Sequence, residues 1–223
     1  MSTDETKGQL MYALQVADTP NFQTEMRQLL RERIIETARR VVVTEGWGAV
    51  NMSRLAKEVG VSRPVMYKEF ANKHDLAEVV IRQELDVFLI GIAQCLAAHP
   101  ADSTAGMIAA VDFTLRTGAD NTLLKAVLSG RTGADTSLLP VLMTEPEPVL
   151  GRAIEAVAAA LRLQYEFVTV SDTDLAAASE TLVRLALSHL FQPIGPIERA
   201  VDQIAAVIKA VLAPALGTPP AAA

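Results

Sequence analysis

Apolar residues recur at helical spacing along most of the chain, and glycines and prolines divide this pattern into a series of helices. Leu30, Ile34, Ala38 and Val41 follow one another at intervals of four, four and three residues, which is the period of one helix face. The alternation that marks half-buried strands is scarce, so the pattern predicts an all-α fold. The expected helices span about 27–45, 51–59, 62–70, 73–98, 103–117, 121–129, 147–164, 171–190 and 196–212.

The helix boundaries are sharpest between residues 51 and 76. Asn51 is a good N-cap, and Gly60 suits the left-handed conformation that ends a helix. Ser62 is a second N-cap, followed by Pro64 in the first helical turn, where the missing N–H is no loss. Two short helices joined by a tight turn form a helix-turn-helix, in which the second helix enters the major groove of DNA.

This stretch resembles the N-terminal domain of TetR-type transcriptional repressors, over roughly the first third of the chain. The resemblance is carried by Leu55-Ala56, Gly60-Val61-Ser62, Tyr67, Phe70, Lys73 and Leu76. It implies an N-terminal helix-turn-helix domain followed by a helical bundle that binds a ligand and dimerises. We therefore expect a flexible arm at 1–26, the DNA-binding domain at 27–75, the ligand-binding and dimerisation domain at 76–216 and a tail at 217–223.

The charge is divided unevenly between these parts. The chain has a net charge of −6, yet residues 27–75 hold ten Lys and Arg against six Asp and Glu, a local balance of +4. Residues 1–26 and 76–223 are acidic, at −3 and −7. A local positive face is enough for phosphate contact, and an acidic body discourages indiscriminate binding.

Composition disfavours several other classes of protein. No apolar run reaches the roughly 18 residues of a membrane span, and the first ten residues lack the features of a secretion signal. The single cysteine, Cys95, fits a reducing cytoplasm and is expected in the core. His74, His99 and His189 have no metal-spaced partners, and neither a phosphate loop nor a nucleophile elbow is present. We expect no enzyme activity, no metal and no cofactor.

Eight residues are expected to contact double-stranded DNA. Arg63 stands at the amino end of the recognition helix, where pairing with a guanine and contact with a phosphate both remain open. Val65 suits a thymine methyl, Lys68 suits the groove or a phosphate, and Tyr67 matches a position that binds phosphate in TetR-type repressors. The full set is Asn51, Ser62, Arg63, Pro64, Val65, Tyr67, Lys68 and Lys73.

Two departures from the usual pattern affect this set. Pro64-Val65 replaces a small residue followed by Thr or Ser, which leaves fewer donors to face bases and puts the operator sequence beyond prediction. Glu69 places a carboxylate near phosphates. We expect Glu69 to point away from the DNA or to pair with Arg or Lys, so that its replacement by Ala leaves DNA binding unchanged or tighter. Met66 and Phe70 are expected in the core.

The last two long helices carry a heptad-like seam. In the final helix, apolar residues recur at spacings of 4, 3, 4 and 3, and the preceding helix repeats the pattern. Such a pair of helices suits a four-helix interface between two copies, although packing within one subunit explains the same pattern. The expected interface residues are Leu175, Leu182, Leu185, Ile197, Val201, Ile204 and Ile208.

The helices between residues 73 and 190 supply flexible and aromatic apolar side chains. Lining of a ligand cavity and ordinary core filling both explain them. Arg116 suits the carboxylate of a ligand, but the last turn of a helix is also an ordinary place for a solvated cation. The candidate ligand-binding residues are Phe88, Ile92, Met107, Phe113, Arg116, Met143, Phe167 and His189.

Together these features predict a cytoplasmic, homodimeric TetR-like repressor that binds a palindromic operator and is released by a small apolar effector. The string Arg-Pro-x-x-Tyr-Lys-Glu-Phe at 63–70 is similar to actinobacterial regulators of lipid and alkane genes, which suggests a fatty acid or another lipid-like effector. The alternative is a lipid-binding helical protein without DNA binding, for which Glu69 and the acidic total are the support. Steep salt dependence of DNA binding separates the two.

Overall fold

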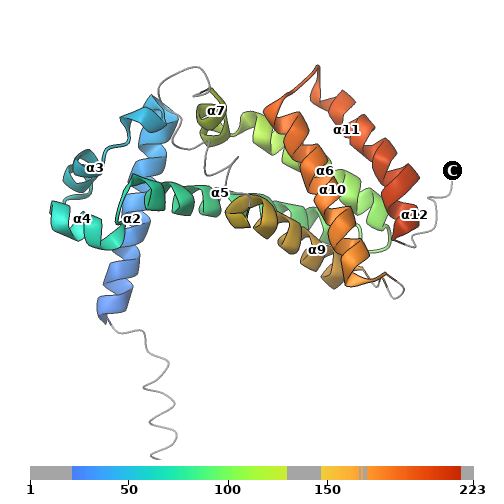
Figure 1. Ribbon diagram of the computed structural model, residues 1–223, viewed down its shortest axis with the longest axis horizontal. Coiled ribbons are helices and arrows are strands. Elements are labelled where there is room, and N and C mark those ends of the chain that lie inside the picture. Colours follow the sequence, from blue (N-terminus) through green and yellow to red (C-terminus); the bar gives the residue numbers. More distant parts are fainter. Residues whose placement is uncertain (1–21, 130–146, 166, 168–169, 217–223) are drawn as a thin grey trace, which may run out of the picture.

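The computed structural model describes residues 22–129, 147–165, 167 and 170–216, and these residues contain helices and no β-strand (Figure 1). The predicted all-α fold is confirmed. The elements are α2 (Phe22–Glu45), η1 (Trp47–Ala49), α3 (Met52–Val59), α4 (Arg63–Glu69), α5 (Lys73–Ala97), α6 (Ser103–Asp120), α7 (Thr122–Ser129), η3 (Glu147–Gly151), α9 (Arg152–Gln164), α10 (Asp172–Phe191), α11 (Ile197–Val207), η4 (Ile208–Leu212) and α12 (Ala213–Ala215).

Most helices begin and end close to the predicted positions, and the ends of α2 and α6 differ from the prediction. Helix α2 begins at Phe22, inside the expected arm, and α6 continues to Asp120 rather than ending near Thr117. Gly118 is buried within α6, where its missing side chain leaves room for Leu190 of α10. The rest of the expected arm, the expected tail and residues 130–146 lie outside the described residues.

The predicted cap positions around the short helices are confirmed, but of the two N-cap residues Asn51 makes capping hydrogen bonds through its side chain and Ser62 makes none. The Oδ1 atom of Asn51 accepts hydrogen bonds from the backbone N–H groups of Ser53 and Arg54, at 2.9 and 3.2 Å. Gly60 ends α3 with a φ of 85°, which a side chain would strain. Ser62 precedes α4, and Pro64 lies in its first turn. These local signals explain why α3 and α4 are short and separated by a tight turn.

Two hydrophobic cores share one long helix. The first core joins α2, α3, α4 and the amino-terminal part of α5, and it buries Trp47 of η1. The second joins the rest of α5 with α6, α9, α10, α11 and η4. At 25 residues, α5 is about 37 Å long. Figure 1 shows it running from the α2–α4 unit into the larger bundle.

Helices α5 and α6 pack closely because a glycine faces an aromatic ring. A Cβ atom on Gly91 of α5 would lie 2.0 Å from Cζ of Phe113 on α6. At the far end of α5, the Tyr165 hydroxyl lies 3.1 Å from the carbonyl oxygens of Leu96 and His99. Burial raises the pKa of Tyr165, and the negative charge of Asp102 raises it further by a smaller amount. These contacts hold the carboxyl end of α5 in the bundle.

Candidate DNA-binding face and ligand cavity

One face of α4 is exposed and the other is anchored in the first core. Met66 and Phe70 are buried, as predicted, and fix the helix against the domain. The residues on the exposed face and at the amino end are those expected to contact DNA, namely Ser62, Arg63, Pro64, Val65, Tyr67 and Lys68. Asn51 is also exposed, at the start of α3. The fold thus leaves two basic side chains, Arg63 and Lys68, on the face of the second helix of the helix-turn-helix.

Lys73 is the eighth expected contact, and the structure gives it an interaction inside the domain. Its Nζ donates to the carbonyl oxygen of Trp47 at 2.8 Å and lies 5.0 Å from the centre of the indole ring. This contact joins the first turn of α5 to η1. Lys73 therefore helps to fix the angle at which α5 leaves the DNA-binding domain.

Glu69 is buried and paired with arginine, as predicted. Arg27 Nε of α2 lies 3.0 Å from each of its carboxylate oxygens, and Arg31 Nη1 lies 3.4 Å from one of them. Arg31 also donates to the backbone carbonyl of Glu69 at 2.5 Å and lies 4.4 Å from the centre of the Phe70 ring. The carboxylate holds the end of α4 to α2 rather than facing the DNA.

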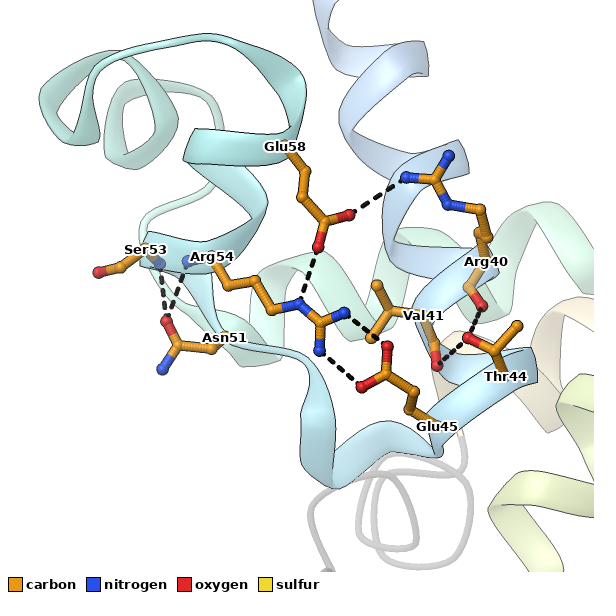
Figure 2. A network of polar contacts seen from close by, with 8 residues as sticks. All are labelled: Arg40, Val41, Thr44, Glu45, Asn51, Ser53, Arg54 and Glu58. Atoms are coloured by element: carbon orange, nitrogen blue, oxygen red, sulfur yellow. Dashed lines mark hydrogen bonds and ion pairs between the residues drawn. The ribbon is translucent and has the colours of Figure 1, made fainter.

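Another arginine, Arg54, which was not predicted from the sequence to have a role, ties α3 to α2 (Figure 2). Arg54 donates two parallel hydrogen bonds to Glu45, at 2.5 and 2.7 Å, and a third to Glu58 at 2.7 Å. Arg40 of α2 also donates to Glu58, at 3.1 Å. Hydrogen bonding to Arg54 holds the pKa values of Glu45 and Glu58 below those of ordinary carboxyl groups. Only the spacing of Arg54 and Glu58 by four residues signals any of this in the sequence.

The larger bundle contains an apolar, partly open cavity of about 520 Å³, a size that suits a small-molecule ligand. Helices α5, α6, α7, α9 and α10 and the η3 turn contribute its walls. Three of the expected ligand-binding residues line it: Phe88, Ile92 and Met107. Almost all other lining residues are Leu, Ile, Val or Ala, so the cavity favours hydrocarbon.

Four expected ligand-binding residues do not line this cavity. Phe113 packs against Gly91 instead, and Phe167 is buried with its ring 5.8 Å from that of Tyr165. Arg116 is held at the surface by Asp112 and Glu198, which raise its pKa. His189 is half-buried and lies outside the lining, although its neighbour Leu190 belongs to it. Met143 lies outside the described residues.

The cavity meets the core of the DNA-binding domain at one end. Ile81 and Leu123 belong to the first core and also line the cavity, and Val149 packs against that core from the cavity wall. Glu84, one turn after Ile81, also lines the cavity. Glu84 was not predicted as a cavity residue, because it lies in a polar stretch of α5 beside Arg82, Gln83 and Asp86, where no local pattern marks it.

Four of the seven side chains expected at the dimer interface are buried within the single chain. Leu175, Leu182, Ile204 and Ile208 are buried in the second core, so the prediction of partner contacts is wrong for these four side chains. Packing inside one subunit, the alternative drawn from the sequence, accounts for them. Leu185, Ile197 and Val201 are half-buried at the edge of this core and stay candidates for an interface.

The structure also bears on the expectations about Cys95, membrane spans and metal sites. Cys95 is half-buried against the second core, and burial raises the pKa of its thiol. In the described ranges, no helix is both long and apolar enough to cross a membrane. Within the same ranges, no group of three or more His, Cys, Asp or Glu is placed to hold a metal ion.

Comparison with known proteins relates both parts of the chain to one family. Residues 34–80 match the model for bacterial regulatory proteins of the tetR family, and residues 102–210 match that for the C-terminal domain of the bacterial tetracyclin repressor. The HTH-type transcriptional regulator AlkX of Mycobacterium tuberculosis is 26% identical over 75% of this chain and 77% of its own. An HTH-type regulator of Staphylococcus aureus is 32% identical over 45% of this chain and 54% of its own.

Solved structures show the same fold. The TetR family repressor AlkX from a Dietzia strain, implicated in biodegradation of n-alkanes, superposes with a TM-score of 0.67 at 24% identity, over 84% of this chain and 95% of its own. The repressor QsdR of R. erythropolis gives 0.61 at 21% identity, over 88% and 98%. RolR, solved with resorcinol, gives 0.59 at 15% identity, over 86% and 94%. The exposed face of α4, the cavity in the second bundle and the two matching models together show that this chain belongs to the TetR family of transcriptional regulators.

Proposed function

We propose that this regulator is a cytoplasmic homodimeric repressor that binds a palindromic operator and releases it when a small apolar molecule fills the cavity. The observation that carries the proposal is that α5 belongs both to the core of the DNA-binding domain and to the wall of the cavity. Its amino-terminal part, with Leu76, Val80 and Ile81, lies in the DNA-binding core. Its carboxyl-terminal part, with Phe88 and Ile92, lines the cavity. A ligand that favours one placement of α5 therefore shifts the population of orientations of the DNA-binding domain.

The apolar lining and the named relatives support the class of effector. Nearly the whole wall is aliphatic or aromatic, which suits a lipid-like or alkane-like molecule. The Dietzia AlkX is implicated in the biodegradation of n-alkanes, and RolR was solved with resorcinol as its ligand. Both names connect proteins of this fold with apolar or aromatic molecules. We infer that the effector is mainly apolar.

We propose that the dimer forms through the outer faces of α10 and α11. The side chains on these faces include Thr181, Arg184 and Ala206, which are exposed, and Val211 of η4, which is 58% exposed. A twofold arrangement would present two copies of α4 to successive major grooves, roughly 34–36 Å apart. Sedimentation of the full chain at micromolar concentration tests this, because a monomer under those conditions contradicts it.

The operator is testable without knowing the regulated genes. Duplexes selected by the protein from a random library should converge on a palindrome. Their affinity should fall steeply as salt rises, because basic side chains displace counterions from phosphates. Selection that yields no common sequence, together with binding insensitive to salt, would instead support a ligand-binding protein without DNA binding. The structure removes one support for that alternative, since Glu69 is paired with Arg27 and Arg31.

A further inference from the structure

Glu84 is the acidic residue among the described residues that line the cavity. Among the described residues that line it, the polar ones are Glu84, Thr114 and Arg184. The Thr114 hydroxyl donates to the carbonyl of Ala110 at 2.7 Å, within its own helix. Arg184 is 59% exposed and paired with Glu180. The Glu84 side chain is only 14% exposed, so it is the more buried of the two charged side chains in this lining.

Both oxygens of Glu84 contact groups from other elements. Arg39 Nη2 of α2 lies 2.5 Å from one oxygen, and the side-chain amide of Asn121 donates to the other. Asn121 also caps α7, because its Oδ1 accepts from the backbone N–H of Leu124 at 2.7 Å. Glu84 therefore joins the DNA-binding domain, α5 and the start of α7 at a single carboxylate. A carboxylate offers about four acceptor sites, so capacity for a ligand remains.

We propose that Glu84 recognises the polar head of the effector, that this head is a neutral or cationic hydrogen-bond donor, and that it competes with Arg39 for the carboxylate. The inference rests on the proposed ligand-binding function of the cavity. A hydrocarbon tail would lie along Phe88, Ile92 and Met107. A fatty acid entering carboxylate-first is disfavoured, since two negative charges would meet where little water screens them.

Competition at Glu84 links ligand binding to the DNA-binding domain. Arg39 belongs to α2, which carries Glu69's two partners and much of the first core. A donor that takes Glu84 weakens one of the polar ties between α2 and α5. The cavity end at Ile81, Leu123 and Val149 adjoins the same core, so the head group and the tie lie at the same place.

The test uses three probes of equal chain length: n-decylamine, n-decanol and n-decanoate. Binding to the full chain is measured by calorimetry below the concentration at which each probe aggregates. The wild type should bind the amine and the alcohol at least about tenfold more tightly than the carboxylate. Glu84→Gln should reduce this preference to within about threefold. Arg39→Gln should strengthen binding of the amine, because the competing cation is gone.

Glu36→Gln is the matched control, because it removes the same charge from an exposed side chain of α2 outside the lining and should preserve the preference. Circular dichroism checks that each variant is folded, and Arg39→Gln provides an independent test should Glu84→Gln unfold. Equal or tighter binding of decanoate by the wild type overturns the proposal. So does a preference that survives Glu84→Gln, or failure of all three probes to bind. Operator binding on the same samples separates this from the repressor proposal, which falls only if specific DNA binding is absent.

Discussion

Arg27 and Glu69 form an ion pair between α2 and the last turn of α4, with Arg27 Nε 3.0 Å from both carboxylate oxygens. The Glu69 side chain is 4% exposed, whereas that of Arg27 is 56% exposed. The acid is therefore desolvated while one of its partners stays in solvent. Its role is to hold α4 against α2, and this role decides what a substitution at Glu69 does.

Replacing Glu69 with Ala should lower the free energy of unfolding by about 1–3 kcal/mol, because Arg31 and Arg27 lose their acceptor, with the exposure of Arg27 keeping the cost moderate. Urea unfolding followed by fluorescence of the single tryptophan, Trp47, measures this directly, since Trp47 lies in the same core. Glu36→Ala, an exposed acid on α2, serves as the control and should change stability by less than about 0.5 kcal/mol. Equal stability of the two variants would show that the pair does not fix α4.

Arg63 distinguishes base recognition from phosphate contact. Arg63→Lys keeps a positive charge but loses the planar fork that pairs with guanine, whereas Arg63→Ala loses both. We expect both variants to lose about 1–3 kcal/mol of discrimination at one base pair of the selected operator. Only the Ala variant should also show a shallower dependence on salt. Fluorescence anisotropy with matched and substituted duplexes measures each, and undiminished base discrimination in Arg63→Lys would assign Arg63 to a phosphate.

Filling the cavity should abolish the response to ligand without abolishing DNA binding. Ala110 lines the cavity and is 5% exposed, so Ala110→Leu places three more carbon atoms in its interior. We expect binding of the neutral dye Nile red to weaken about tenfold or more, while operator affinity stays within about twofold. Ala119→Leu, at an exposed position of the same helix, is the matched control. Unchanged dye binding in Ala110→Leu would mean that the dye binds elsewhere.

The glycine at the crossing of α5 and α6 gives a prediction about packing. Alanine normally stabilises a helix by about 1 kcal/mol relative to glycine. At Gly91, however, the added Cβ would lie 2.0 Å from Phe113. We expect Gly91→Ala to destabilise the chain by about 1–3 kcal/mol, because the ring must move from a packed position. Phe113→Leu in the same chain should recover part of the loss in a thermal melt, and simple additivity of the two changes would argue against the clash.

Local signals in the sequence were enough for the helix-turn-helix. Asn51, Gly60 and Pro64 each favour a particular backbone conformation at one position, so the ends of α3 and α4 follow without knowledge of the rest of the fold. Apolar spacing likewise gave Met66 and Phe70 as buried residues. The pairing of Glu69 with arginine followed from the cost of placing a carboxylate beside phosphates.

Contacts between distant helices were not predictable in the same way. The periodicity of Ile204 and Ile208 shows that α11 and η4 have an apolar face, but a core and a dimer seam require the same spacing. Phe113 and Phe88 have the same chemistry, and only the position of Gly91 decides which of them is excluded from the cavity lining. The meeting of Arg39 with Glu84 depends on how α2 crosses α5, which no local pattern encodes.

The most direct test of the account is the operator affinity of the wild-type chain with and without saturating n-decanol, a neutral ligand that brings no charge to the DNA. Coupling of about 1–3 kcal/mol between the cavity and the DNA-binding face predicts a rise in Kd of roughly 5- to 150-fold, lost in Ala110→Leu. An unchanged Kd, with calorimetry showing the cavity occupied, would contradict the claim that α5 transmits ligand binding to the DNA-binding domain.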